Sequence, residues 1–348
     1  MNKHGGYYGD DYEEIIDFSV NINPLGVPEK LIEILKEELE KMKRYPEIDG
    51  ISGKEAIGQH LGIHSENIIL GNGATELIYL YARSLRPENV LIVEPTFNEY
   101  SKAFKIAGSN IYNYCTNEED NFRIQVEGLI SKIDDIRPNV LVICNPNNPT
   151  GTFAGMDKLL PILHKLNEIN AYLFVDESFI DFTDKVSLIP LIEKYDIFIL
   201  RSMTKIFAVP GLRIGYGIGN REVVSKLNQL KEPWTINSLA LKSIPVLIED
   251  SDYLRRTQCW YQEEKQFLYN ELKAVPNIKV IESETNFFLI KLLKGDSNSL
   301  KEYLLGKKIY IRSCEDFQGL SDKFIRIAVR KRKENYKLIE ELKQYMKN

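Results

Sequence analysis

Short apolar runs that alternate with helical patterns are the feature that most limits how this chain can fold. The runs are rich in Ile and Val, end at Gly, Pro, Asn or Asp, and are mostly separated by helical patterns such as residues 74–85 and 155–169. Uninterrupted apolar strands of this kind are typical of a mostly parallel sheet that helices cover on both faces. The six strands predicted in this way lie within residues 67–73, 89–95, 139–151, 171–178, 197–202 and 212–219.

The C-terminal part of the chain has a different pattern. A helical stretch from about residue 221 to 271 leads to several short strands, two of which alternate in a half-buried manner, with helices beside them. This pattern favours a smaller α+β domain. We therefore predict an α/β fold with a large domain at residues 45–232, a smaller domain at 233–348, and an N-terminal segment, residues 1–44, that packs on the smaller domain.

Charge and cysteine content exclude several classes of function. The net charge is −5, and the one dense basic stretch, residues 330–335, leads into an amphipathic helix, so we expect no nucleic-acid partner. The four cysteines are far apart and lack metal-ligand spacing, so we expect reduced thiols in the cytoplasm and no metal. No secretory signal is expected at the N-terminus, and no apolar run approaches the roughly 20 residues of a membrane helix.

Polar residues gather where the predicted strands end. They occupy residues 71–73, 145–151, Asp176 and residues 202–205. Parallel sheets bind ligands beyond the carboxyl ends of their strands, so these four clusters are expected to converge on one site.

Two of these clusters are turns with more than one interpretation. Residues 71–76 follow a strand and open a helix, and their glycines could let backbone N–H groups approach an anion. The same residues could equally form a tight turn capped by Thr75. They match neither a P-loop nor a dinucleotide fingerprint. Residues 145–151 could form a structural turn, or could direct an asparagine N–H at a ring oxygen.

The other two clusters carry charged groups. Asp176 ends a buried strand, so its carboxylate either caps the next helix or accompanies the protonated nitrogen of a pyridine ring. Lys205 is either a surface residue or a Schiff-base lysine, whose pKa desolvation and nearby cations would lower. Ser202, Thr204 and Arg213 then offer hydroxyl groups and a guanidinium to a phosphate ester.

Taken together, these motifs resemble the fold type I enzymes that use pyridoxal 5'-phosphate (PLP), over essentially the whole chain. The resemblance implies that Lys205 carries the cofactor as a Schiff base and that Asp176 partners the pyridine nitrogen. It further implies that Asn148 contacts the ring oxygen and that Phe97 stacks on the ring. Around the cofactor phosphate it places Gly73, Ala74, Thr75, Ser202, Thr204 and Arg213. Tyr45 would reach the cofactor of a neighbouring subunit, which implies a homodimer.

Two groups within this class are most similar, the threonine-phosphate decarboxylases of cobalamin biosynthesis and the histidinol-phosphate aminotransferases. Residues 4–6, 17–26, 201–216, 232–240 and 311–330 resemble the decarboxylases. The aminotransferases usually have a tyrosine three residues after the aspartate, where this chain has Phe179. The resemblance therefore favours PLP-dependent decarboxylation of O-phospho-L-threonine, with transamination as the alternative, since the residues alone do not show which Cα bond is presented for cleavage.

The same resemblance implies a set of substrate contacts. Two arginines and a histidine suit a substrate that carries a carboxylate and a phosphate. The arginines could instead form surface salt bridges, and the N-terminal tail could be disordered. A catalytically silent scaffold is a further alternative, which the intact lysine, aspartate and Arg213 disfavour. The implied substrate contacts are His4, Gly5, Asn21, Asn148, Arg312 and Arg326.

Overall fold

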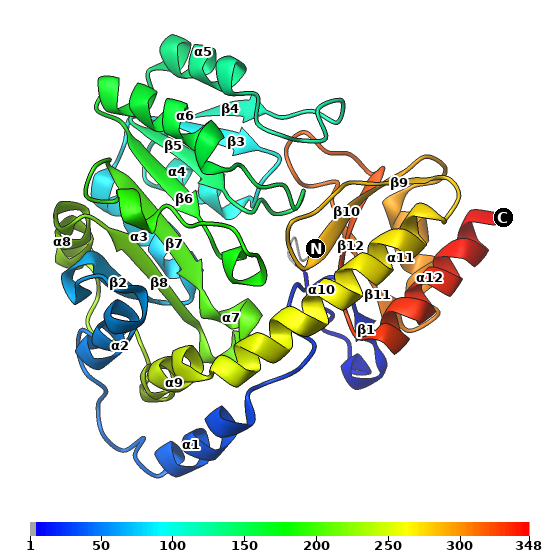
Figure 1. The fold of residues 1–348 in the computed structure, drawn as a ribbon, viewed down its shortest axis with the longest axis horizontal. Coiled ribbons are helices and arrows are strands. Elements are labelled where there is room, and N and C mark those ends of the chain that lie inside the picture. Colours follow the sequence, from blue (N-terminus) through cyan, green and yellow to red (C-terminus); the bar gives the residue numbers. More distant parts are fainter. Residues whose placement is uncertain (1–4, 348) are drawn as a thin grey trace.

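The computed structural model describes residues 5–347, and a seven-stranded sheet is its largest element (Figure 1). Its strands are β2 (Ile68–Asn72), β3 (Asn89–Glu94), β4 (Asn110–Cys115), β5 (Val140–Cys144), β6 (Tyr172–Asp176), β7 (Ile197–Ser202) and β8 (Ile214–Gly219). They lie in the order β2–β8–β7–β6–β5–β3–β4. All neighbours are parallel except that β8 is antiparallel to β2 and β7. The predicted mostly parallel sheet is confirmed.

Strand β4 was not predicted. It lies at the edge of the sheet and pairs only with β3, and its sequence, NIYNYC, has no continuous apolar run. Its residues are exposed or half-buried, and only one strand pairs with its backbone. An edge strand of this kind carries a weak sequence signal.

Helices cover both faces of the sheet, and alternate strand residues point into the two layers. Leu141, Leu173 and Ile199 belong to the core on one face, whereas Val142 and Phe174 belong to the core on the other. The first core is completed by α2 (Ile51–Leu61), α5 (Val126–Ile136), α6 (Met156–Glu168) and α9 (Ser238–Glu249). The second is completed by α3 (Ala74–Leu85), α4 (Glu99–Ile106) and α8 (Arg221–Leu230).

A second body lies beside the large sheet. It contains an antiparallel sheet in the order β12–β13–β10–β9 and a parallel pair, β1–β11. Its elements are β1 (Ile16–Asp17), α10 (Ser251–Lys273), β9 (Ile278–Val280), β10 (Phe287–Leu292), α11 (Ser297–Leu305), β11 (Ile309–Tyr310), β12 (Arg312–Ser313), β13 (Phe324–Ala328) and α12 (Arg332–Lys347). Their apolar faces form a separate core.

The N-terminal segment contacts both bodies. Ile16 pairs with Ile309, and Phe18 lies in the core of the second body. Helix α1 (Glu29–Leu39) packs instead against α9, and its Leu31 joins the core of the large sheet. The predicted boundaries after residues 44 and 232 stay predictions.

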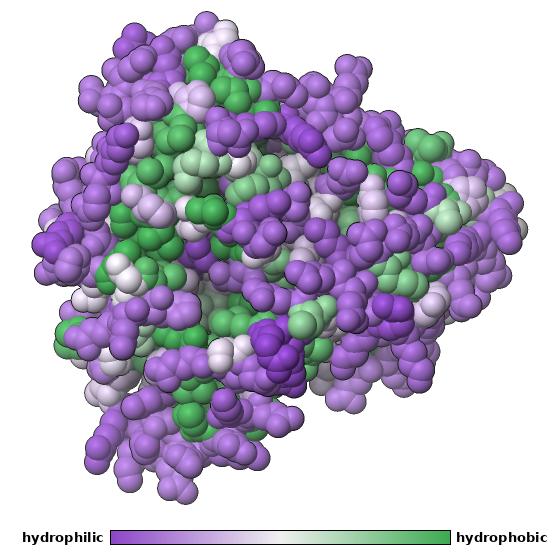
Figure 2. All heavy atoms as spheres, in the orientation of Figure 1, coloured by the Kyte–Doolittle hydropathy of each residue, from purple (hydrophilic) through white to green (hydrophobic). Residues whose placement is uncertain are grey.

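Short helical turns connect these elements, and the expected long helix is divided. The helical stretch predicted for residues 221–271 consists of α8, α9 and α10, because Asn237 and Asp250 cap new helices with their side chains. The remaining turns are η1 (Tyr12–Glu14), η2 (Ser65–Asn67), η3 (Ile180–Phe182), η4 (Ile189–Leu191), α7 (Met203–Ile206) and η5 (Pro210–Leu212). Hydrophilic side chains cover most of the molecular surface seen in Figure 2. No helix within residues 5–347 is long and apolar enough to cross a membrane.

Candidate active site

A cavity of about 310 Å³ lies between the large sheet and the second body. It is bordered by the loops that follow β2, β3, β5, β6 and β7, by the residue that precedes β8, and by residues 19–22 of the N-terminal segment. The second body contributes Arg312, Phe317 and Arg326. Because β8 runs opposite to its neighbours, the start of this strand meets the carboxyl ends of the others. The predicted convergence of the polar clusters is therefore observed.

Most of the predicted site residues line this cavity. Gly73 and Ser202 lie directly behind its wall, in contact with Arg213 and Lys205. Tyr45 is 85% exposed, packs against Trp234 and is not part of the lining. His4 lies outside the described residues. The predicted residues that do line the cavity are Gly5, Asn21, Ala74, Thr75, Phe97, Asn148, Asp176, Thr204, Lys205, Arg213, Arg312 and Arg326.

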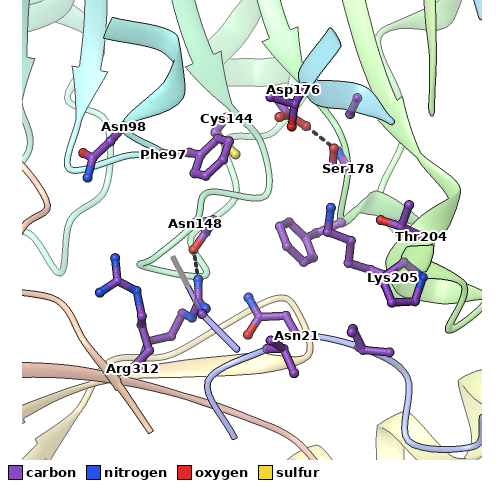
Figure 3. A pocket seen from close by; sticks show the side chains of 18 of the residues that line it. Asn21, Phe97, Asn98, Cys144, Asn148, Asp176, Ser178, Thr204, Lys205 and Arg312 are labelled. Atoms are coloured by element: carbon purple, nitrogen blue, oxygen red, sulfur yellow. Dashed lines mark hydrogen bonds between the residues drawn. The ribbon is translucent and has the colours of Figure 1, made fainter. Parts of the chain in front are cut away.

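The carboxylate of Asp176 is buried and held by two hydrogen bonds. The hydroxyl of Tyr100 donates to Oδ2 at 2.6 Å, and the backbone N–H of Ser178 donates to Oδ1 at 2.8 Å. These donors offset part of the cost of burying the carboxylate. Figure 3 shows Asp176 and Ser178 on the wall formed by the large sheet. A fixed anion at this wall is suited to a cationic ring nitrogen.

The amine of Lys205 reaches into the same cavity from the turn after β7 (Figure 3). Its Nζ donates to Ser202 Oγ at 3.2 Å, and Ser202 Oγ is 2.8 Å from Thr204 Oγ1. Burial is the main cause that lowers the pKa of Lys205; Arg213 lowers it further, while Asp176 opposes both. A lysine with a lowered pKa has more uncharged amine at neutral pH, and the uncharged amine is the form that attacks an aldehyde.

The first turn of α3 and Arg213 form an anion-binding corner. Gly73 precedes the helix at φ 75° and ψ 161°, and a Cβ at this position would lie 2.4 Å from Arg213 Nη2. On β8, a Cβ at Gly215 would lie 2.4 Å from the backbone N of Ala74. The two glycines therefore allow the guanidinium and the helix N-terminus to meet. Helix N-termini and guanidinium groups both bind phosphate oxygens.

The opposite wall is basic. Arg326 is buried and donates to Asn148 Oδ1 and, at 2.6 Å, to the carbonyl oxygen of Ser19. Burial lowers the pKa of Arg326 to about 10, so it stays charged at neutral pH. Among the described residues, Arg326 Nε and Asn21 Oδ1 are buried polar atoms that lack a hydrogen-bond partner. A ligand in the cavity could satisfy such groups.

Several lining residues were not predicted from the sequence. They include Asn98, Tyr100, Cys144, Ser178 and Phe317. Tyr100 lies in the first turn of α4, three residues after Phe97, and the two rings meet edge to face with centroids 5.7 Å apart. Cys144 is directly paired with Asp176 in the sheet register, which a prediction of strand boundaries alone does not reveal.

The fold and this site define a class of protein. The sequence profile of aminotransferase class I and II matches residues 13–342, and the chain belongs to this family. Enzymes of this family depend on PLP. The amine of Lys205, the carboxylate of Asp176 and the anion-binding corner at Gly73 and Arg213 fit the aldehyde, ring nitrogen and phosphate of that cofactor.

Three relatives make the comparison more specific. A protein from Caldanaerobacter subterraneus subsp. tengcongensis, provisionally named threonine-phosphate decarboxylase, is 39% identical and covers 98% of this chain and 93% of its own. The threonine-phosphate decarboxylase of Salmonella typhimurium is 32% identical over 96% of this chain and 92% of its own. The crystal structure of the histidinol-phosphate aminotransferase from Clostridium acetobutylicum superposes with a TM-score of 0.89 at 34% identity, covering 95% of this chain and 99% of that one.

Proposed function

We propose that this enzyme decarboxylates O-phospho-L-threonine to (R)-1-aminopropan-2-ol O-2-phosphate in cobalamin biosynthesis. The observation that carries the proposal is the near full-length similarity, at 39% and 32% identity, to two proteins named threonine-phosphate decarboxylase. The site supports it, because the predicted cofactor residues face a basic wall on which a second anionic group could bind.

The basic wall supports a substrate with two anionic groups. Arg312 and Arg326 line the cavity from the second body, across from the Lys205 amine. Arg326 also retains a buried N–H without a partner among the described residues. Guanidinium groups pair well with both carboxylates and phosphates. By fixing these groups, the two arginines would decide which Cα substituent is presented for cleavage.

The residues of the chain have separable roles in this reaction. When bound, PLP supplies an aldehyde for the substrate amine and a ring that accepts the electron pair of the broken bond. Asp176, held by Tyr100 and Ser178, stabilises a proton on a ring nitrogen placed against it. As the bond from Cα to the carboxylate breaks and CO2 leaves, Cα needs one proton, and the Lys205 ammonium is the group placed to donate it.

Asn148 and Phe179 support decarboxylation over transamination. Arg326 donates to Asn148 Oδ1, so the amide presents its Nδ2 donor side for the ring oxygen. Phe179 is buried edge-on against Phe287, with ring centroids 5.1 Å apart, and it has no hydroxyl to offer. The contact that a tyrosine would make to the ring oxygen therefore rests on Asn148.

The alternative is a histidinol-phosphate aminotransferase. It is favoured by the similarity to the Clostridium acetobutylicum structure, at a TM-score of 0.89. That reaction also needs PLP and a substrate that combines an amine with a phosphate, so the anion-binding corner and the basic wall do not discriminate between the two reactions.

A substrate assay separates the two functions. Pure enzyme with PLP and O-phospho-L-threonine, without any keto acid, should release one CO2 and one amino alcohol phosphate per substrate over many turnovers. Absence of CO2, together with transfer of the amino group of histidinol phosphate to 2-oxoglutarate to give glutamate, would contradict the proposal and establish the alternative.

We also infer that the enzyme is a homodimer in which Tyr45 contacts the cofactor of the partner. Large apolar side chains are exposed every three to seven residues from α1 to the start of α2, and the ring of Tyr45 packs against the exposed Trp234 rather than against its own cavity. Where exposed apolar side chains form one patch, the patch marks a protein interface. The residues concerned, each at least 42% exposed, are Ile32, Leu39, Met42, Tyr45, Ile48, Ile51 and Trp234.

Sedimentation velocity tests the dimer directly. The particle should have twice the 40.2 kDa mass of one chain, and Tyr45→Ala should weaken PLP binding without changing that mass. A monomer that keeps full PLP affinity would refute both inferences. The enzyme is further expected in the cytoplasm, which its four free cysteines support.

A further inference from the structure

Arg312, one of the two arginines that the second body contributes to the cavity, is bound by an acidic residue. Its Nη2 donates to both carboxylate oxygens of Asp316, each at 2.8 Å. Its Nη1 donates to the carbonyl oxygen of Ser313 at 2.6 Å, and its guanidinium carbon lies 5.1 Å from the ring centre of Phe317. The two ion-pair partners are only 11% and 17% exposed, so solvent screens this pair less than a surface pair.

Asp316 also reaches the other body of the protein. Asn98 Nδ2 lies 3.1 Å from the carbonyl oxygen of Asp316 and 3.3 Å from its Oδ2. Asn98 directly follows Phe97 and precedes α4, so it belongs to the large-sheet side of the cavity, whereas Asp316 lies in the loop between β12 and β13. In Figure 3, Asn98 lies above the cavity on the large-sheet side and Arg312 lies below it on the second body, both at the left of the view.

This arrangement reduces two costs of anion binding. An arginine that a carboxylate and an aromatic ring already hold loses less side-chain freedom when the ligand arrives. Burial is the main cause that lowers the pKa of Arg326. Arg312 lowers it further and Asp316 raises it, so Asp316 offsets part of the repulsion between the two guanidinium groups. Neither effect requires Asp316 to touch the substrate.

We propose that Asp316 is a positioning residue that orients Arg312 for the anionic group of the substrate and, through Asn98, links this arginine to the large-sheet side of the cavity. The proposal deepens the function proposed above and rests on it for the identity of the substrate. The three residues Asn98, Asp316 and Arg312 form one unit, called here the anion latch. Its function is to keep Arg312 in a binding-ready position before substrate arrives.

The central test is Asp316→Asn, which keeps the shape of the side chain and removes its charge. We expect the KM for O-phospho-L-threonine to rise about tenfold, within the range measured for coupled residues in contact, while kcat changes less than about threefold. PLP content and the absorbance of the bound cofactor should not change. Asn98→Ala should raise KM by a smaller factor, and should raise it no further in the Asp316→Asn background.

A matched control and a turnover-free readout complete the design. Glu334→Gln removes another i,i+4 ion pair of similar exposure, Arg330–Glu334, whose residues do not line the cavity, and it should leave KM unchanged. Titration of inorganic phosphate into the PLP-loaded enzyme by calorimetry should give about tenfold weaker binding to Asp316→Asn than to the wild type.

Any of three results would overturn the anion latch. The first is a KM for Asp316→Asn that is lower than, or within twofold of, the wild-type KM, and the second is an equal rise in KM for Glu334→Gln. The third is a double variant whose rise in KM equals the product of the rises caused by Asn98→Ala and Asp316→Asn alone. If the wild type releases no CO2 from O-phospho-L-threonine, the proposed function fails. The phosphate titration then still decides on Asp316: tenfold weaker binding to the variant supports its positioning role, and equal binding ends it.

Discussion

Substitution of Gly73 by alanine tests the anion-binding corner in two separable ways. The backbone at Gly73 has φ 75° and ψ 161°, a region that is almost restricted to glycine. Strain of this type costs about 1–3 kcal/mol, and this cost should appear as a lower free energy of unfolding of the cofactor-free protein. The added Cβ would also lie 2.4 Å from Arg213 Nη2.

That contact is relieved if the guanidinium moves, because Nη2 is the end of a flexible side chain. The movement takes the guanidinium away from the N-terminus of α3, so a charged hydrogen bond to the cofactor phosphate is lost. Such bonds contribute about 1.5–3 kcal/mol, which corresponds to a roughly 10- to 100-fold rise in the dissociation constant of PLP. Arg213→Ala removes the group altogether and sets the upper limit of this loss.

The assay is a PLP titration of the cofactor-free protein, followed by absorbance, beside urea unfolding of the same protein. Gly211→Ala is the matched control, since a Cβ there meets no atom within 4 Å and its φ is not positive. In the Arg213→Ala background, Gly73→Ala should weaken PLP binding no further. If Gly73→Ala binds PLP within twofold of the wild type, Arg213 does not hold the cofactor phosphate and the reasoning fails.

Three more predictions follow from the site. Burial lowers the pKa of Lys205 below its ordinary 10.5, so the rate at which the cofactor-free protein attaches PLP should fall only as pH drops through that lowered value. Absorbance of the bound cofactor, followed over time at a series of pH values, measures this rate. A midpoint of the rate against pH at or above 10.5 would contradict the pKa shift. Tyr100→Phe should lower the free energy of unfolding by about 1–3 kcal/mol, because the buried Asp176 carboxylate loses a hydrogen-bond donor. Tyr112→Phe, on the exposed edge strand, is the control. An equal loss of unfolding free energy in both variants would contradict the role of the hydrogen bond. Removal of residues 1–6 should raise the KM for O-phospho-L-threonine at constant PLP content, and unchanged kinetics would exclude His4 and Gly5 from substrate binding.

The sheet was predictable where its strands are buried on both faces. Strands β5, β6 and β7 are entirely or almost entirely buried, so their sequences are continuous apolar runs. The edge strand β4 lacked this signal. The direction of β8 was also hidden, because an apolar run has the same pattern whichever way it crosses the sheet, and only the pairing with β2 and β7 shows that it is antiparallel.

The same distinction applies to the site. Asp176 and Lys205 stand at the carboxyl ends of predicted strands, so their convergence followed from the topology of parallel sheets. Arg213 precedes β8 and reaches the same edge only because that strand is antiparallel. Tyr100 and Asp316 reach the site through packing instead. The bond from Tyr100 to Asp176 spans 76 residues, and the one from Asn98 to Asp316 spans 218. Contacts of this kind depend on how a helix or loop settles on its neighbours, which local sequence patterns do not encode.

The pairing of β1 with β11 has a consequence for synthesis on the ribosome. Ile16 and Asp17 must wait for Ile309 and Tyr310, about 293 residues later, before this two-stranded sheet can close. At about 5–20 residues per second, that delay is roughly 15 to 60 s. The large sheet is fully translated earlier, so the newborn chain can complete the Lys205 side of its cavity while Phe18 and its neighbours still lack their partners.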